Sequence, residues 1–151
     1  VAPAGPAAVG RVGEQLRLLH GDRERHLRNL YAGPVGGRRA CRARDHLRLA
    51  RVQLNMGIAQ SRLAHWALAQ ELFTSAVEFY RKLGDARGAA NALDALAEVL
   101  LAQQQWPAAL AVVEQAWQEL GDQRTQPGLA PLLADIRKHW AAARQGLADA
   151  D

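Results

Sequence analysis

Residues 45–84 read DHLRLARVQLNMGIAQSRLAHWALAQELFTSAVEFYRKLG, and residues 85–121 read DARGAANALDALAEVLLAQQQWPAALAVVEQAWQELG. A shift of 40 residues lays the second stretch over the first and produces five identities. The identical pairs are Asp45 with Asp85, Ala50 with Ala90, Trp66 with Trp106, Ala69 with Ala109, and Ala76 with Ala116. Apolar residues between these positions recur at helical spacing. Each unit therefore predicts a helix, a short turn and a second helix.

Helix-start signals fall at the same places in both units. Asp45 and Asp85 are expected to cap the first helix of each unit, because an aspartate side chain accepts hydrogen bonds from the free N–H groups of the first turn. Trp66 and Trp106 are expected at the bend before the second helix, and Pro107 suits the first turn of that helix. Two helices that begin at matching signals predict a repeated helical hairpin.

This pattern resembles the tetratricopeptide repeat (TPR) family in its longer bacterial form. The family places a bulky residue, Leu-Gly and an aromatic on the first helix, and then alanine, an aromatic and alanine on the second. The matching positions are Gln53, Met56, Gly57, Gln60, Ala69, Phe73 and Ala76 in the first unit, and Leu93, Leu96, Ala97, Leu100, Ala109, Val113 and Ala116 in the second. Gln53 and Gln60 depart from the bulky residues usual there. The resemblance implies an all-α fold in which antiparallel hairpins stack as a short right-handed solenoid.

The rest of the chain divides around these two units. We expect a disordered tail over residues 1–10, because it contains only Ala, Pro, Gly and Val. A helical segment with a Gly/Pro loop is expected over 11–37, the first unit over 38–84 and the second over 85–122. Residues 123–151 are expected to form a C-terminal capping helix and tail. Its apolar stripe is Leu129, Leu132, Leu133, Ile136, Trp140, Ala143 and Leu147.

Composition excludes several classes of protein. Ala and Leu dominate and β-branched residues are scarce, which favours helices. The single cysteine cannot form an intrachain disulfide or a cysteine-based zinc site. No apolar run is long enough to span a membrane, and residues 1–10 do not read as a signal peptide. We therefore expect a cytoplasmic helical protein with no membrane partner.

Catalytic patterns are weak throughout the sequence. The only serines, Ser61 and Ser75, fall within predicted helices rather than at a sharp turn that would expose a nucleophile. The histidines lack the spacing of metal ligands, and no glycine-rich phosphate loop is present. The sequence thus predicts a protein that is not an enzyme and that has no cofactor and no metal site.

The TPR resemblance implies a concave groove lined by the first helices of successive units. That groove would bind a protein or peptide whose identity the sequence does not give. Asn55 matches the asparagine with which peptide-binding family members hold the ligand backbone. Arg51, Arg62 and Lys138 are suited to bind carboxylates, because guanidinium and ammonium groups donate charge-assisted hydrogen bonds. The expected groove residues are Arg51, Leu54, Asn55, Ile58, Arg62, Asn91, Asp94, Glu98 and Lys138.

The four tryptophans separate into two groups. Trp66 and Trp106 repeat at the bend, and Trp140 falls on the apolar stripe of the last helix, so core packing is expected for these three. Trp117 replaces Val77 of the first unit, so no core role is assigned to it.

Charge supports an alternative function. The formal net charge of +4 conceals a basic N-terminal part followed by an acidic remainder. A stripe of arginines on one helix surface can track phosphates, which favours a nucleic-acid-associated regulator. The arginines in question are Arg38, Arg39, Arg42, Arg44, Arg48 and Arg51. A second alternative is a bare oligomerisation module, and the sequence leaves both a monomer and a homodimer open.

Overall fold

The computed structural model describes the backbone of residues 38–150 and the side chains of residues 42–150. The tail predicted over 1–10 and the helical segment and loop predicted over 11–37 lie outside the described residues. The chain divides after Arg42 into two compact units. Of the first unit only residues 38–42 are described, as the start of a helix, and the helices below otherwise belong to the second unit.

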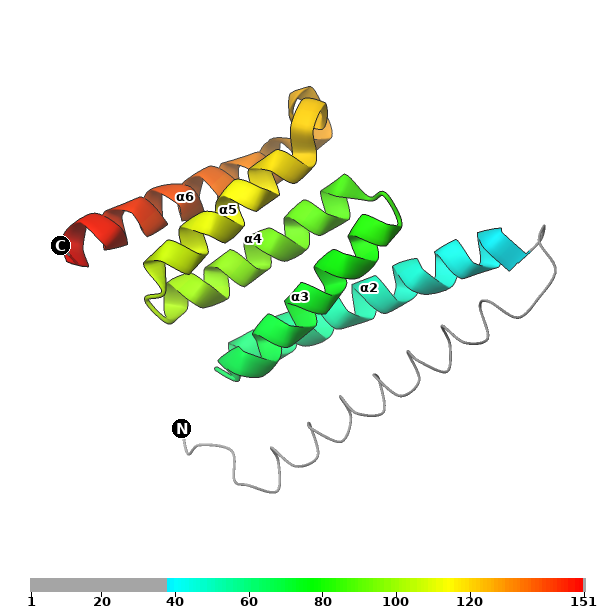
Figure 1. Cartoon of the computed structure of the whole chain (residues 1–151), viewed down its shortest axis with the longest axis horizontal. Helices are drawn as coiled ribbons and strands as arrows, with labels where there is room; N and C mark the ends of the chain where they lie inside the picture. The colour runs from blue at the N-terminus through cyan, green and yellow to red at the C-terminus, as the bar shows by residue number, and fades with distance from the viewer. Residues whose placement is uncertain (1–37, 151) are drawn as a thin grey trace, which may run out of the picture. The chain divides into compact units, whose positions relative to one another are not determined.

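Five α-helices account for most of the described residues, and no strand occurs among them, so the all-α prediction is confirmed. Successive helices run in opposite directions (Figure 1). Two short 3-10 helices, η1 and η2, separate the last two α-helices. The elements in order are α2 (Arg38–Arg62), α3 (Trp66–Lys82), α4 (Ala86–Ala102), α5 (Trp106–Leu120), η1 (Gly121–Thr125), η2 (Pro127–Leu129) and α6 (Ala130–Ala150).

Three turns of the same kind join α2, α3, α4 and α5. In each turn one residue has a positive φ: 57° at Ala64, 67° at Gly84 and 59° at Gln104. The N–H group of the next residue bonds back to a carbonyl five residues earlier, and that of the positive-φ residue to one three residues earlier, as in the Schellman motif. The turns are spaced 20 residues apart. The 40-residue sequence repeat therefore corresponds to two identical helix–turn steps.

One of the two predicted helix caps is correct and the other is wrong. Asp85 caps α4, and its side chain accepts a hydrogen bond of 2.8 Å from the N–H group of Gly88. Asp45 lies inside α2, which already begins at Arg38. The difference lies upstream, because Gly84 ends α3 in a left-handed turn, whereas residues 38–44 contain no glycine or proline that would interrupt a helix.

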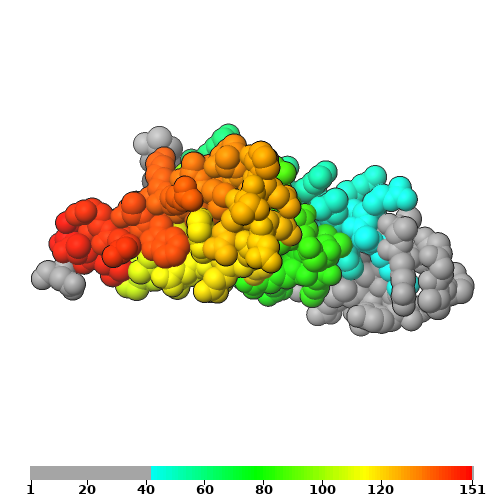
Figure 2. Space-filling view, turned by 90° about the horizontal axis from the view of Figure 1, so that it is seen from above, coloured from blue at the N-terminus to red at the C-terminus, as the bar shows by residue number. Residues whose placement is uncertain are grey.

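Alanines provide the closest contacts in the core. Ala69, Ala76, Ala109 and Ala116 are completely buried, so the repeated alanines lie where helices approach one another. The helix α4 packs against both α3 and α5, and α6 packs against α5 and also against α4. Figure 2 shows η1, η2 and α6, in orange to red, over the yellow α5. The helices α4 and α6 therefore contact each other directly, although α5 lies between them in sequence.

One pair of facing residues on the two helices of each unit has side chains whose sizes compensate for each other. Gly57 lies against the buried ring of Phe73, and a Cβ atom at Gly57 would stand 2.5 Å from the Cε1 atom of that ring. Forty residues later the same two positions hold Ala97 and Val113, both completely buried. A larger residue on one helix thus accompanies a smaller residue on the other.

The last helix follows its predicted stripe in part. Leu129, Leu133, Ile136 and Ala143 are buried, whereas Leu132, Trp140 and Leu147 are half-buried. The helix begins at Ala130, and Pro131 falls in its first turn, where the missing N–H group costs no helical hydrogen bond. None of the helices in the described part of the chain is both long and apolar enough to cross a membrane.

Candidate functional site

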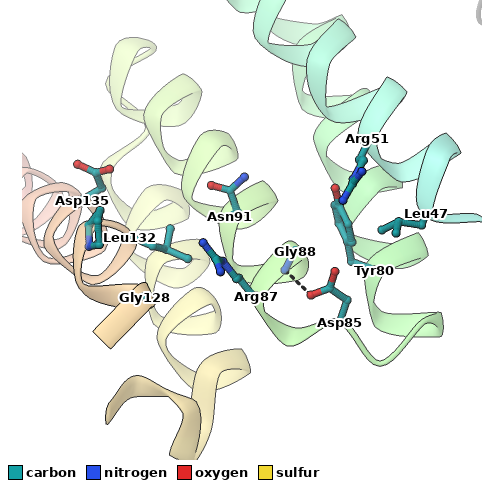
Figure 3. Close-up of a pocket in the computed structure, with 11 residues that line it drawn as sticks. Leu47, Arg51, Tyr80, Asp85, Arg87, Gly88, Asn91, Gly128, Leu132 and Asp135 are labelled. Carbon is teal, nitrogen blue, oxygen red and sulfur yellow. Dashed lines mark hydrogen bonds between the residues drawn. The ribbon is translucent and has the colours of Figure 1, made fainter. Parts of the chain in front are cut away.

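A pocket of about 510 Å³ opens between α2, α4 and the start of α6. Figure 3 shows Arg51 and Tyr80 on one side of it, Leu132 and Asp135 on the other, and side chains of α4 between them. Three helices that are not consecutive in sequence thus enclose one space. The pocket is lined by Leu47, Arg51, Tyr80, Asp85, Arg87, Gly88, Asn91, Gly128, Pro131, Leu132 and Asp135.

The first turn of α4 supplies the centre of the pocket. Arg87 and Asn91 are four residues apart, so both lie on the same face of this helix, and both are exposed. Gly88 lies against the ring of Tyr80, which occupies the space that a Cβ atom would need. The hydrogen bond from the Gly88 N–H group fixes the carboxylate of Asp85 at the N-terminus of α4. The backbone geometry of this turn therefore positions the polar side chains.

The pocket combines charges of both signs with one buried phenol. Arg51 and Arg87 bring positive charge, and Asp85 and Asp135 bring negative charge. Burial raises the pKa of the Tyr80 hydroxyl, the nearby Asp85 carboxylate raises it further, and Arg51 opposes the shift. The Tyr80 hydroxyl is therefore neutral near pH 7 and able to donate a hydrogen bond.

Two of the nine predicted groove residues, Arg51 and Asn91, line this pocket. The exposed side chains among the others are Asn55, Arg62, Glu98 and Lys138, and Ile58 is half-buried. These five residues lie outside the pocket lining, farther along the first helices of the two units or on α6. Their role in binding stays a prediction.

Leu54 and Asp94 are buried, each with 8% of its surface exposed. Leu54 belongs to the hydrophobic core, so it offers little surface to a ligand. The Oδ1 atom of Asp94 lies 2.7 Å from the Nδ1 atom of His139, which joins α4 to α6. The hydrogen bond with Asp94 raises the pKa of His139 against the opposing effect of burial. The Asp94 carboxylate is therefore already engaged within the fold.

Several pocket residues were not predicted from the sequence. The sequence indicates Asp85 only as a helix cap and gives Arg87 and Tyr80 no role. The spacing of Arg87 and Asn91 by four residues is a signal that was available, since residues at i and i+4 share one helix face. No such signal places Tyr80 in the pocket, because only the packing of α3 against α4 brings it there.

The residues considered for nucleic-acid binding, nucleophilic catalysis and metal binding lie as follows. Arg44, Arg48 and Arg51 are exposed along α2, and Arg42 is half-buried, whereas the side chains of Arg38 and Arg39 lie outside the described residues. Ser61 donates a hydrogen bond of 2.8 Å to the carbonyl of Ile58 within its own helix. Among residues 42–150, no three His, Cys, Asp or Glu side chains gather as metal ligands would.

Comparison with known proteins gives no relative: no protein-family model, no curated protein and no solved structure matches this chain. The geometry of the pocket and the exposed charges around it are therefore what bears on function.

Proposed function

We propose that this chain is a non-enzymatic binding module that holds a segment of a partner protein in a groove formed by α2, α4 and α6. The observation that carries the proposal is the pocket between these three helices, with Arg51 and Asn91 exposed within it. The bound segment would be extended or helical. The exposed residues farther along the groove, Asn55 and Arg62 among them, would extend the contact.

A TPR-like stack is part of the proposal. Turns that recur every 20 residues and alanines buried at the close contacts support a regular succession of hairpins. The contact between α4 and α6 supports the pairing of first helices that such a stack requires. The proposal includes the right-handed solenoid, the longer bacterial form of the repeat and the cytoplasmic location that the sequence predicts.

The chemistry of the pocket favours a peptide with backbone and carboxylate groups to offer. The amide of Asn91 is able both to donate to and to accept from a peptide backbone. Arg51 and Arg87 are suited to hold carboxylates through paired hydrogen bonds. Asp85 and Asp135 would repel a uniformly acidic ligand, so the segment that fits best carries charges of both signs.

A peptide-display selection on the intact chain tests the proposal. Peptides enriched on the wild type are measured against the double variant Arg51→Glu/Asn91→Ala, and we expect affinity to fall about tenfold or more. The matched control is Arg44→Glu/Gln115→Ala, which makes the same two kinds of change at exposed positions outside the pocket. Peptides that bind both variants as well as the wild type would contradict the groove assignment.

The two alternatives make different predictions in solution. A nucleic-acid-associated protein would bind a DNA duplex with a steep salt dependence that Arg44→Glu/Arg48→Glu removes. An oligomerisation module would sediment as a stable dimer or larger species and enrich no peptide. Either result, together with a failed peptide selection, would replace the binding-module proposal.

A further inference from the structure

A second cleft, separate from the groove, lies between α5 and α6. It is a shallow, open hollow of about 400 Å³, lined by Trp117, Arg137, Trp140, Ala141 and Arg144. The rings of Trp117 and Trp140 meet edge to face, with their centroids 6.2 Å apart and an angle of 76° between their planes. Both tryptophans are half-buried, so each presents part of an indole at the surface. The cleft therefore has an aromatic floor.

The α6 side of the cleft has a regular pattern. Arg137, Trp140, Ala141 and Arg144 occupy positions i, i+3, i+4 and i+7, which form one stripe on a helix. At 1.5 Å per residue the two arginines begin about 10.5 Å apart along the helix axis. An apolar centre is thus bracketed by two cations, each about one turn away.

Arg137 is held against Trp117 in a way that leaves its hydrogen-bonding edge open. The guanidinium groups of Arg124 and Arg137 lie 4.8 Å and 5.6 Å from the centroid of the Trp117 ring. A guanidinium stacked on an indole still presents its N–H fork to a carboxylate. Arg137 and Arg144 are both exposed, and neither has a carboxylate partner among the residues that the structure describes.

We propose that this cleft docks an acidic amphipathic helix of a partner protein, with two carboxylates seven residues apart on Arg137 and Arg144 and the apolar residues between them on Trp140. The positive charge of the cleft complements an acidic helix. The spacing of Arg137 and Arg144 along α6 matches that of two carboxylates seven residues apart on the partner helix. A nucleic acid fits less well, because a base that stacks on Trp117 would have to displace the guanidinium groups already lying there. The proposal concerns a surface other than the groove and does not depend on it.

The test uses the whole chain and two synthetic helical peptides of about 18 residues, long enough to form a helix when bound. The probe carries glutamates at i and i+7 and leucines at i+3 and i+4. The control peptide has the same composition, with the glutamates moved to the opposite face from the leucines. Calorimetry measures both affinities, and we expect the wild type to bind the probe about tenfold or more tightly than the control peptide.

The informative variant is Ala141→Glu, which places a carboxylate four residues after Arg137 and three before Arg144. That carboxylate pairs with the arginines within the helix and competes with the peptide, while it leaves the core unchanged because Ala141 is exposed. We expect probe binding to fall about tenfold or more. Ala67→Glu, the same change at an exposed position of α3, is the matched control and should alter the affinity by less than about twofold.

Three outcomes would overturn the proposal. Equal binding of the probe and the control peptide, or equal loss in both variants, would show that only diffuse charge is involved. Tighter binding of single-stranded oligothymidylate that Ala141→Glu abolishes would assign the cleft to nucleic acid. A dimer in sedimentation that the same variant dissociates would assign it to a second copy of the chain. The groove variant Arg51→Glu/Asn91→Ala should leave probe binding unchanged, which separates this proposal from the groove.

Discussion

His139 on α6 and Asp94 on α4 share a hydrogen bond of 2.7 Å between Nδ1 and Oδ1, and both side chains are largely buried. The bond joins the last helix of the fold to the middle one. The pKa of His139 is raised, first by this hydrogen bond and then by the charges of Asp94 and Glu98, whereas burial and Lys138 act in the opposite direction. Protonation of His139 therefore strengthens the attachment of α6.

This relationship predicts that the bond stabilises the protein in a pH-dependent way. Because the folded pKa of His139 lies above its unfolded value of about 6.5, the contribution is complete below that pH and is lost as pH rises through the folded pKa. We expect Asp94→Asn to lower the unfolding free energy by about 1–3 kcal/mol at acid pH and by less at alkaline pH. Urea unfolding at several pH values measures the difference.

Asp149→Asn provides the control for this prediction, since Asp149 is an exposed acid of the same helix that lies ten residues from His139. Its effect should be small and nearly independent of pH. An NMR titration of the His139 imidazole should also show a lower pKa in Asp94→Asn than in the wild type. A His139 pKa that does not change would refute the assignment.

The contact between Gly57 and Phe73 predicts a coupled pair of mutations. Gly57→Ala should destabilise the protein by about 1–3 kcal/mol, because the added methyl group has to displace a buried ring. Phe73→Val should cost about 3 kcal/mol through the cavity it leaves. The double variant recreates the Ala97 and Val113 combination of the second unit, so it should be more stable than the sum of the two costs predicts by about 1 kcal/mol or more.

Thermal or chemical unfolding of the four proteins in this cycle measures the coupling. Gly128→Ala is the matched control, because a Cβ atom at Gly128 has no neighbour within 4 Å. Its effect on stability should be slight. Strict additivity of Gly57→Ala and Phe73→Val would show that the two residues do not share a packing constraint.

The positive φ angles at Ala64 and Gln104 predict two stabilising substitutions. A residue with a Cβ atom is strained in the left-handed region, and Gly84 already occupies the equivalent place in the middle turn. Ala64→Gly and Gln104→Gly should each raise the unfolding free energy by about 0.5–1 kcal/mol, after the greater entropy of glycine in the unfolded chain is subtracted. Ala111→Gly, at an exposed position inside α5, should instead lower it by about 1 kcal/mol. Differential scanning calorimetry measures the stability of the three variants. A shift of all three in the same direction would contradict the strain assigned to Ala64 and Gln104.

The buried amide of Gln53 leads us to predict a third stabilising substitution. Its side chain is buried, and its Oε1 atom has no hydrogen-bond partner among the described residues. The equivalent positions 40 residues apart hold Leu93 and Leu133, both buried. Gln53→Leu should therefore raise the unfolding free energy by about 1–2 kcal/mol, because a buried polar atom is removed. A decrease in the midpoint of urea unfolding would show that the amide has a partner in solution.

Local features of the fold were predictable because they depend on neighbouring residues. The structure confirms three features that follow from local signals: the cap at Asp85, the helices that begin at Trp66 and Trp106, and the buried residues Leu133, Ile136 and Ala143 of α6. Asp45 failed as a cap for a local reason too: seven residues before it favour a helix and none interrupts it. The repeat indicated where helices end without indicating how far α2 extends toward the N-terminus.

The candidate site was predictable only in part. Arg51 and Asn91 were placed in the groove from their positions on the first helices, and both line the pocket. Tyr80 was missed because it comes from a second helix, and Asp94 was expected to face a ligand although it bonds to His139. Both cases depend on contacts between helices, of α3 with α4 for Tyr80 and of α4 with α6 for Asp94.

Local signals in the sequence were enough to place the helices that follow Trp66 and Trp106 and the small residues at their contacts, because helix periodicity and capping act within a few residues of one another. Which polar side chains meet depends instead on how the helices pack. The distance between Asp94 and His139, and the edge-to-face contact of Trp117 with Trp140, depend on how far each helix is rotated and shifted against its neighbour. Those offsets are set by the packing of all the helices together, and no local stretch of sequence carries them.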